Sequence, residues 1–359
     1  MNYKNEIFID ERRIAFDEPT YFIADIAANH DGDLNRAKDL IYKAKEAGAD
    51  CAKFQHFLPD KIVSDYGFKH LTTGQSHQAK WEKSVYEIYE QYHCKREWTL
   101  ELVKTCKDAG IEFMTTPYDY KALEELDQYV NAYKIGSGDI TWIEFIEKIA
   151  KLNKPVIMAC GASDMNDVER AVNAITNINP QIVLMQCNTN YTASLENYKY
   201  VNLNVIKTFA EKYPGMILGL SDHTFGSATV LGAVTLGVRV VEKHFTDDNN
   251  RKGPDHKFAM NPVTWRDMVD RTRELELALG DGIKRVEGNE KDTVIVQRRC
   301  IRLKNDLKSG SKITENDIEF LRPAPTDAYF PYEKSSVIGK AVNKDKQQGD
   351  YISRGDLIG

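Results

Sequence analysis

Short apolar runs alternate along the first 280 residues with longer stretches in which apolar residues recur every three to four positions. The runs have the length of buried strands and occupy residues 21–27, 51–57, 112–117, 132–138, 155–160, 182–187, 216–223 and 238–246. The stretches between them have the spacing of amphipathic helices and occupy residues 34–48, 96–110, 120–130, 142–152, 164–177, 202–213, 225–237 and 264–280. Eight strands that alternate with eight helices predict an α/β fold, the (β/α)₈ or TIM barrel.

Three segments depart from this alternation. Residues 7–16 have the pattern of a short hairpin, which we expect to close the bottom of the barrel. Residues 59–95 are polar and aromatic and follow the second predicted strand, so they extend a loop on the catalytic face, where a long insertion is usually a lid or a substrate wall. Beyond Gly280 the composition changes, which predicts a barrel domain over 1–280, a linker over 281–292 and a small β-rich domain over 293–359.

Composition and charge narrow the class of protein. The chain has 359 residues, of which 42% are hydrophobic and 28% charged, as in an ordinary soluble globular protein. Its 48 basic and 54 acidic residues give a net charge of -6, which does not favour nucleic acid or a membrane surface as a partner. We find no signal peptide or membrane-spanning run. The six cysteines have no CxxC spacing, so we expect a cytoplasmic protein with reduced thiols.

Two histidines mark the most informative stretch, residues 216–246. An apolar run ends in Ser221-Asp222-His223, a small-residue helix follows, and a second run ends in Glu242-Lys243-His244. A strand–helix–strand unit places its two strands side by side and parallel, about 4.8 Å apart. The two imidazoles therefore lie close enough to share a divalent first-row metal ion with open positions for substrate. The alternative for either histidine is a hydrogen-bonded structural role.

The other strand ends supply acids, cations and hydroxyls. Asp25 interrupts an apolar strand, where an acid is costly unless it is paired or functional. Three lysines and three hydroxyl groups are expected to form a mouth that suits an anion such as a phosphate with a carboxylate: Lys53, Lys134, Lys243, Thr116, Ser137 and Ser221. A lysine paired with a structural carboxylate is the alternative. The aromatic residues of the insertion, including Trp81, are interpreted as packing residues.

A series of motifs resembles the sialic acid synthases, the family of N-acetylneuraminate, legionaminate and pseudaminate synthases. The motifs are IADIAANHDGDL (23–34), KFQHF (53–57), TTPYD (115–119), YKIGSGD (133–139), GLSDHT (219–224), EKHFT (242–246) and GPDHKF (253–258). LRPAP (321–325) and VIGKAV (337–342) resemble the C-terminal antifreeze-like (SAF) domain of that family. The resemblance implies a TIM barrel with an SAF domain, assembled as a domain-swapped homodimer.

The resemblance also implies a reaction. Members of the family condense phosphoenolpyruvate with an open-chain N-acetylated amino sugar, either N-acetylmannosamine or a 2,4-diacetamido-trideoxyhexose, and use Mn or Mg. By resemblance His223 and His244 hold the metal, and Asp25 and Lys53 belong to the catalytic set. The positions that match phosphoenolpyruvate binding are Lys53, Thr116, Lys134, Ser137 and Ser221. Those that match the surroundings of the sugar and the metal are Gln55, Thr189, Tyr191 and Asp255, and Arg322 matches an arginine that the partner's SAF domain extends to the N-acetyl group.

This chain departs from the family pattern at several positions near the substrate. Asp25 stands where the family typically has Glu, and Ala159 where many members have Ser. Asn188, Thr189 and Thr192 also differ from the usual residues of their loop. Two other readings therefore stay open beside the synthase. One is a class I aldolase with Lys53 or Lys134 as its Schiff base, and the other is a catalytically degenerate sugar-binding homologue.

Overall fold

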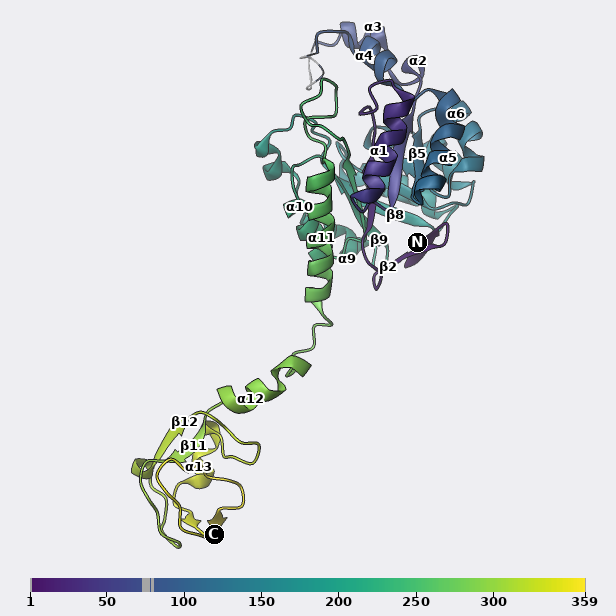
Figure 1. Ribbon diagram of the computed structural model, residues 1–359. Coiled ribbons are helices and arrows are strands. Elements are labelled where there is room, and N and C mark those ends of the chain that lie inside the picture. The colour runs from purple at the N-terminus through teal and green to yellow at the C-terminus, as the bar shows by residue number, and fades with distance from the viewer. Residues whose placement is uncertain (1, 73–77, 79–80, 359) are drawn as a thin grey trace. The chain divides into compact units, whose positions relative to one another are not determined.

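The computed structural model describes residues 2–72, 78 and 81–358 of the chain. It divides into two compact units, Met1–Gly280 and Asp281–Gly359, each of which is considered by itself (Figure 1). Among the described residues, no helix is long and apolar enough to cross a membrane. All six cysteines are buried and free.

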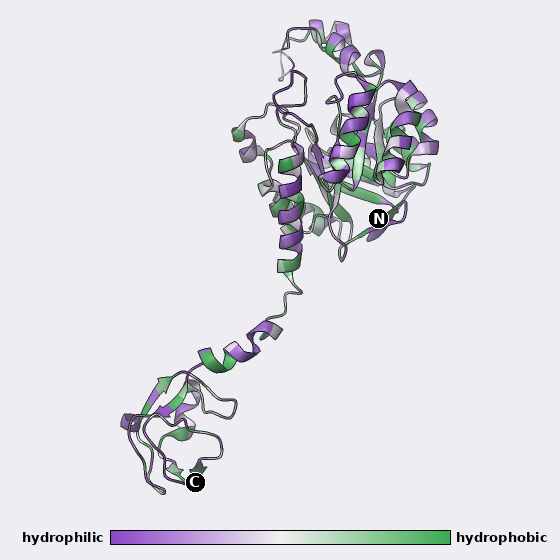
Figure 2. Cartoon of the chain, viewed as in Figure 1, coloured by the Kyte–Doolittle hydropathy of each residue, from purple (hydrophilic) through white to green (hydrophobic). Residues whose placement is uncertain are grey.

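Eight parallel strands close into a barrel in the first unit, with hydrogen-bonded neighbours in the order β10-β3-β4-β5-β6-β7-β8-β9. Their bounds are β3 Tyr21–Asp25, β4 Cys51–His56, β5 Glu112–Pro117, β6 Tyr133–Ile135, β7 Val156–Ala159, β8 Ile182–Cys187, β9 Ile217–Asp222 and β10 Val240–His244. The strands are almost wholly buried because helices cover their outer face and packed side chains fill the interior. Hydrophobic residues are frequent along them (Figure 2). The predicted TIM barrel is confirmed.

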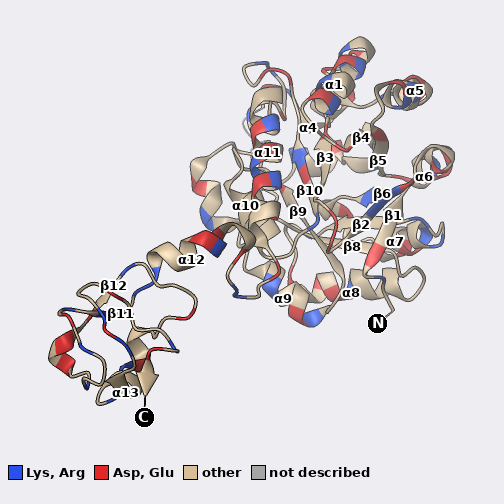
Figure 3. Cartoon of the chain, turned by 60° about the horizontal axis from the view of Figure 1, so that its bottom comes forward, with Lys and Arg blue, Asp and Glu red and all other residues tan. Residues whose placement is uncertain are grey.

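Helices follow the strands around the outside of the barrel. The main ones are α1 Leu34–Glu46, α5 Thr99–Ala109, α6 Tyr120–Leu126, α7 Ile143–Ala150, α8 Met165–Thr176, α9 Val205–Lys212, α10 Ala228–Thr235 and α11 Pro262–Leu279. Helix α1 illustrates how the sequence sets the bounds. The Asp33 side chain accepts from the backbone N–H groups of Asn35 and Arg36, and Gly48 follows the helix with a φ of +95°. Basic and acidic residues are interspersed on several of these helices, for example α1 and α11 (Figure 3).

An antiparallel hairpin closes the bottom of the barrel, as the sequence predicted. It consists of β1 Glu6–Ile9 and β2 Arg12–Ala15. The side chains of Ile7, Ile9 and Ile14 are 1% exposed and belong to the same apolar cluster as the inward-facing residues Tyr21 and Ile157. We therefore expect a substrate to enter at the opposite end of the barrel, where the strands end at their carboxyl termini.

The insertion over residues 59–95 contains three short helices in its described part, where the sequence indicated an irregular segment. They are α2 Pro59–Ile62, α3 Asp65–Lys69 and α4 Val85–Tyr92. Helix α4 begins with a capping box, in which Ser84 and Glu87 bind each other's backbone N–H groups. A single 3₁₀ turn, η2 Arg96–Trp98, joins the insertion to α5.

The second unit is small and built from short strands. Two antiparallel pairs form it: β11 Cys300–Leu303 with β12 Ile318–Leu321, and β13 Ala341–Val342 with β14 Leu357–Ile358. Its apolar core includes Ile301, Leu303, Val337 and Ile352, all fully buried. Two helices accompany the strands, α12 Lys291–Gln297 and α13 Lys334–Val337. Because α12 begins at Lys291, the linker that the sequence predicted over 281–292 is helical at its end.

Candidate active site

The two histidines of the predicted metal pair lie on neighbouring strands at the open end of the barrel. His244 ends β10, His223 follows β9, and their ring centroids are 5.3 Å apart. The Nδ1 atom of His223 lies 2.9 Å from the backbone oxygen of Asn188, so it carries a proton and leaves Nε2 as the basic nitrogen. Burial lowers the pKa of His244 to about 3, which keeps this ring neutral. Burial lowers the pKa of His223, but its hydrogen bond to Cys187 outweighs burial and raises it. His244 can therefore offer a lone pair to a ligand, and His223 can do so through Nε2 once its ring is neutral.

Asp25 lies beside this pair at the end of β3. One of its oxygens, Oδ2, accepts hydrogen bonds from Lys53 Nζ at 2.6 Å and Gln55 Nε2 at 2.9 Å, and it lies 3.8 Å from His244 Nε2. Burial opposes the ionisation of Asp25, but the positive charge of Lys53 outweighs it and holds the pKa below its ordinary value. The shorter acid at position 25 thus still reaches its neighbours on β4 and β10.

A second buried carboxylate, Glu242, connects two lysines. Its Oε1 atom lies 3.2 Å from Lys134 Nζ and accepts a hydrogen bond of 3.2 Å from Ser221 Oγ. Its Oε2 atom lies 3.9 Å from Lys53 Nζ and has no hydrogen-bond partner among the described residues. Burial lowers the pKa of Lys53, but Asp25 and Glu242 reverse this and raise it, so Lys53 is an ammonium ion. Two cations and two anions therefore stand together at the mouth of the barrel.

Hydroxyl groups of the predicted set surround these charges. The Thr116 hydroxyl is buried and has no hydrogen-bond partner among the described residues, so its donor and acceptor capacity is free. Ser137 Oγ accepts from the backbone N–H of Gly161 at 2.9 Å. A Cβ at position 161 would lie 2.6 Å from Thr189 Cγ2 and 3.1 Å from that serine oxygen, so the glycine lets the β7 and β8 loops approach each other.

The β10–α11 loop brings Asp255 over the histidines. Asp255 Oδ2 accepts from the backbone N–H of Ala28 at 3.3 Å and lies 3.7 Å from His244 Nδ1, which has no hydrogen-bond partner among the described residues. Burial raises the pKa of Asp255 to about 6. The rings of Tyr191 and Phe258 complete the surroundings, with centroids 4.4 Å from His223 and 4.9 Å from His244, respectively.

Lys243 does not join the anion-binding mouth, and its assignment to it was wrong. Its ammonium group pairs with Asp222 and donates to the backbone oxygen of Thr224, on the side of the strands that faces α10. The physical reason is the alternation of side chains along a strand, which sends Lys243 outward when Glu242 and His244 point inward. His56 likewise faces outward, where it is hydrogen-bonded to Thr115 and Thr99.

A cavity of about 400 Å³ opens above these residues. Its base comes from strand ends and their loops, with Gln55, Ser137, Asp139, His244 and Asp255 among the lining residues. Its upper wall comes from the insertion, by way of Ile62, Gln78, Trp81, Ile88, Tyr89 and Tyr92. The predicted role of the insertion as a substrate wall therefore has a geometric counterpart. Trp81, interpreted from the sequence as a packing residue, lines the cavity.

Comparison with known proteins decides the family. Residues 40–284 match the model described as the NeuB family, and residues 298–358 match the SAF domain. The chain belongs to the NeuB family. The resemblance to sialic acid synthases found in the sequence is thereby confirmed.

Individual relatives of this NeuB-family chain cover most of its length. An N,N'-diacetyllegionaminic acid synthase of Legionella pneumophila is 34% identical over 335 residues, which are 92% of this chain and 92% of that protein. An uncharacterized protein of Methanocaldococcus jannaschii is 34% identical over 99% of both chains. The crystal structure of the sialic acid synthetase of Leptospira borgpetersenii, in complex with citrate, aligns with a TM-score of 0.71 and 26% identity over 82% of this chain and 96% of that one.

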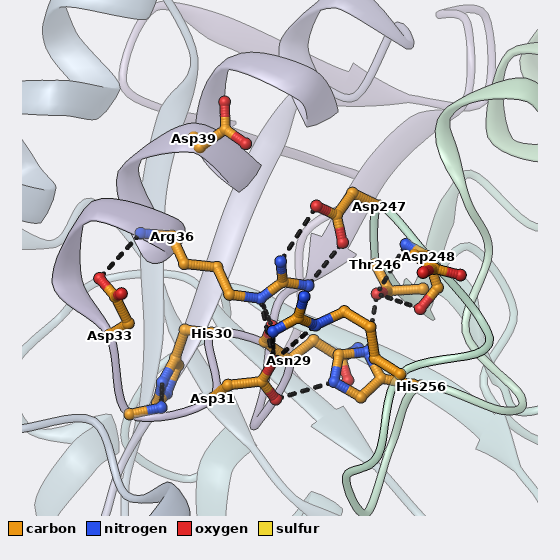
Figure 4. A network of polar contacts seen from close by, with 12 residues as sticks. Asn29, His30, Asp31, Asp33, Arg36, Asp39, Thr246, Asp247, Asp248 and His256 are labelled. Carbon is orange, nitrogen blue, oxygen red and sulfur yellow. Dashed lines mark hydrogen bonds and ion pairs between the residues drawn. The ribbon is translucent and has the colours of Figure 1, made fainter.

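Polar contacts clasp the two loops of the NeuB-family barrel that flank the histidines (Figure 4). Asp31, after β3, accepts from His256 Nε2 at 2.8 Å and from Arg251 Nε at 2.8 Å, both on the β10–α11 loop. Arg36 of α1 pairs with Asp247 of the same loop through both of its terminal nitrogens. Because His256 follows Asp255 directly, this clasp fixes the loop that carries Asp255.

Two further side chains lie beside the predicted site residues. Asp139, in the 3₁₀ turn η4 Ser137–Asp139, lines the cavity, and its buried Oδ2 atom has no hydrogen-bond partner among the described residues. The side chain of Cys187, at the end of β8, is hydrogen-bonded to His223. Their positions at strand ends were the available signal. Arg322 is exposed in the second unit, and its predicted role rests on the resemblance.

Proposed function

We propose that this chain is a synthase that joins phosphoenolpyruvate to the aldehyde carbon of an open-chain N-acetylated amino sugar and yields a nine-carbon 2-keto acid and phosphate. One observation carries the proposal: a histidine pair stands beside two buried lysines that share a carboxylate, Glu242, whose Oε2 atom has no hydrogen-bond partner among the described residues. A relative named N,N'-diacetyllegionaminic acid synthase supports a product of this class.

The lysines and hydroxyls are the groups to bind phosphoenolpyruvate. Lys134, Ser137, Thr116 and Ser221 present one cation and three hydroxyl groups, which match a phosphate and a carboxylate. Since Lys53 and Lys134 are each 2% exposed, their charges act on the bound anion through little intervening water. Their role is to hold and orient the substrate while charge moves away from the reacting carbon.

A divalent cation fits the histidine pair. His244 Nδ1 is buried without a hydrogen-bond partner among the described residues, and the Asp255 carboxylate lies 3.7 Å away. No group of three or more His, Cys, Asp or Glu in the described part of the chain is arranged to hold a metal, so water and substrate oxygens would complete the coordination of Mn or Mg. When bound, such an ion supplies Lewis acidity to the aldehyde oxygen.

The reaction balances with the groups present. C3 of phosphoenolpyruvate forms a bond to the aldehyde carbon, the oxygen of a water molecule adds at C2, and the bond from C2 to the phosphate oxygen breaks. The two protons of that water end on the new alcohol and on the departing phosphate. Asp25 is ionised and lies beside His244, so it is placed to move a proton between water and the new alcohol.

The charge state of Lys53 argues against a class I aldolase. A Schiff-base lysine needs a neutral amine, which proteins obtain by lowering the pKa of the ammonium group. Lys53 has the opposite environment, because Asp25 and Glu242 raise its pKa. Lys134 is paired with Glu242 at 3.2 Å.

The test is phosphate release from phosphoenolpyruvate in the presence of a panel of N-acetylated hexoses, with mass spectrometry of the product. We expect release to stop with EDTA, to return with Mn²⁺ and to be lost in His223→Ala. Phosphoenolpyruvate labelled with ¹⁸O in the bridging position should deliver the label to phosphate, because the C–O bond breaks. Absence of phosphate release with every sugar, in protein that binds Mn²⁺, would favour the degenerate homologue.

In the proposed assembly, the second unit of a partner chain contributes to the sugar site. The proposed assembly is a domain-swapped homodimer in which Arg322 of one protomer reaches the sugar bound by the other. Arg322→Ala should then raise the KM of the sugar far more than that of phosphoenolpyruvate, and the opposite pattern would remove Arg322 from the sugar site.

A further inference from the structure

A second cavity, of about 540 Å³, lies at the amino ends of the barrel strands. Its lining residues come from the β1–β2 hairpin, the end of α1, helix α5 and the starts of neighbouring strands. Tyr21 begins β3, Asp50 precedes β4 and Glu112 begins β5, and all three line it. A volume of this size lies in the range of small-molecule sites.

This cavity is separate from the proposed active site. Tyr21 and Asp25 are the two ends of strand β3. A strand rises about 3.3 Å per residue, so these two residues lie about 13 Å apart. A small ligand held beside Tyr21 therefore does not reach the groups around Asp25.

The charged side chains of the cavity are unpaired. Basic and acidic residues both line it, among them Arg12, Lys45, Asp50 and Glu112. Within the described part of the chain, none of the charged lining residues has an ion-pair partner within 4.0 Å. The next residue of the hairpin, Arg13, pairs with three acids. The cavity therefore keeps charge of both signs available to a ligand.

Arg12 supplies the half-buried positive charge. A guanidinium group has five N–H donors, and in Arg12 one of them, on Nη2, is used, with the backbone oxygen of Pro19 at 3.3 Å. The buried Nε atom has no hydrogen-bond partner among the described residues. A half-buried guanidinium group with free donors suits a carboxylate.

Asp50 and Glu112 supply two half-buried negative charges. The backbone N–H of Glu112 donates to the backbone oxygen of Asp50 at 3.1 Å, so the two residues are neighbours. One oxygen of Asp50 accepts from the Phe22 N–H at 2.8 Å and one of Glu112 from Asn131 Nδ2 at 3.0 Å, which leaves the second oxygen of each free.

The surroundings of these two carboxyl groups do not offset their loss of water. Burial raises the pKa of Asp50, and it raises the pKa of Glu112 to about 6. An ammonium group of a ligand would supply the missing opposite charge. The Tyr21 hydroxyl, which is buried without an oxygen or nitrogen partner among the described residues, lies at the same end of the strands.

Apolar side chains form the rest of the wall. Val103 of α5, Phe113 of β5 and Tyr129 line the cavity. A ligand that fits has a carboxylate, an ammonium group and an apolar body.

We propose that this cavity binds an α-amino acid with an apolar side chain. Arg12 binds its carboxylate, and Asp50 and Glu112 bind its ammonium group. Val103 and Phe113 contact its side chain. The proposal does not depend on the synthase function, because it concerns the opposite end of the barrel.

Isothermal titration calorimetry of the full chain tests the proposal, with L-leucine as the probe. Two derivatives each lack one charge: N-acetyl-L-leucine has no ammonium group and L-leucinamide has no carboxylate. We expect L-leucine to bind with a Kd of about 1 mM or below, which is within reach of a ligand of its size. Each derivative should bind about 10- to 100-fold more weakly, because it loses its hydrogen bonds to a charged group. Glycine should also bind about tenfold more weakly, because it lacks the apolar side chain.

Variants of the wall provide the second arm. Glu112→Gln removes the charge, keeps an acceptor for Asn131, and should reduce the preference for L-leucine over N-acetyl-L-leucine by about tenfold. Arg12→Gln should reduce the preference for L-leucine over L-leucinamide by a similar factor. Each preference is a ratio of two Kd values in one protein, so partial unfolding of a variant does not change it. Arg13→Gln is the matched control, because Arg13 belongs to the same strand and does not line the cavity.

The outcomes decide the proposal. A wild type that shows no binding of L-leucine at about 10 mM overturns it. Equal affinities for L-leucine and its two derivatives overturn it as well. Wild-type preferences in both Glu112→Gln and Arg12→Gln would place L-leucine at another site, and the same losses in Arg13→Gln would show a general effect of charge; either result also overturns it.

Discussion

Removing the imidazole of His256 should release the loop that carries Asp255. The ring is fully buried, with Nε2 2.8 Å from Asp31 Oδ1 and Nδ1 2.8 Å from Thr246 Oγ1. A hydrogen bond to a charged group contributes about 1.5–3 kcal/mol and a neutral one about 1 kcal/mol, so His256→Ala weakens the clasp by about 3 kcal/mol. Since about 1.4 kcal/mol corresponds to a factor of ten, local opening of the loop should become about 100-fold more frequent.

Amide hydrogen exchange, followed by mass spectrometry of peptides that cover residues 247–258, measures this opening without any assumption about catalysis. We expect faster exchange in those peptides and little change in the peptides of β4 to β8. His70→Ala is the control, because His70 is exposed and outside the clasp. A change below about threefold in the loop, or an equal change throughout the barrel, would show that the clasp does not restrain the loop.

Other substitutions test the remaining assignments. Lys243→Met should destabilise the protein by about 3–5 kcal/mol in urea unfolding, because Asp222 is left buried without its cation, and a variant that is stable but inactive would contradict this structural role. Burial raises the pKa of Glu112 to about 6, above its ordinary 4.5, so the wild type loses stability as pH rises from 4.5 to 6. At pH 8 Glu112→Gln should be more stable than the wild type by about 1 kcal/mol, after allowance for solvent screening, and should unfold at a higher temperature. At pH 4 the two proteins should unfold at the same temperature. Equal unfolding temperatures at both pH values would refute the raised pKa of Glu112. Lys53→Met should abolish turnover. Treatment of the wild type with borohydride and pyruvate should leave it unmodified, because Lys53 is an ammonium ion. Covalent trapping of pyruvate at Lys53 would instead indicate a class I aldolase.

The barrel was predictable because its pattern is repeated. Each strand is buried on both faces, so its apolar run is visible in the sequence even where its ends are displaced by one to three residues. For example, the run at 132–138 forms a strand only over Tyr133–Ile135, because Ser137–Asp139 turns into a 3₁₀ helix. The insertion was less predictable, because its short helices depend on local caps such as Ser84 rather than on a long apolar period.

The sequence predicted which residues belong to the site better than it predicted which of them contact each other. Strand alternation places Asp25, Lys53 and His244 on the inner face, and the structure brings them together. The same rule excludes Lys243, whose outward position follows from its neighbours on either side. What the sequence alone does not give is the sharing of Glu242 by two lysines, since a contact across the barrel depends on side-chain length and on the tilt of strands.

The described part of the insertion contributes no strand to the barrel, and this has a consequence for protein engineering. Residues 59–95 form a cassette that begins after β4 and ends at η2, so its exchange between homologues would leave every strand pairing of the barrel intact. One position outside the cassette would have to be kept: a Cβ at Gly32 would lie 2.9 Å from the backbone oxygen of Gln91. Grafted cassettes therefore offer a route to a new cavity wall on an unchanged barrel.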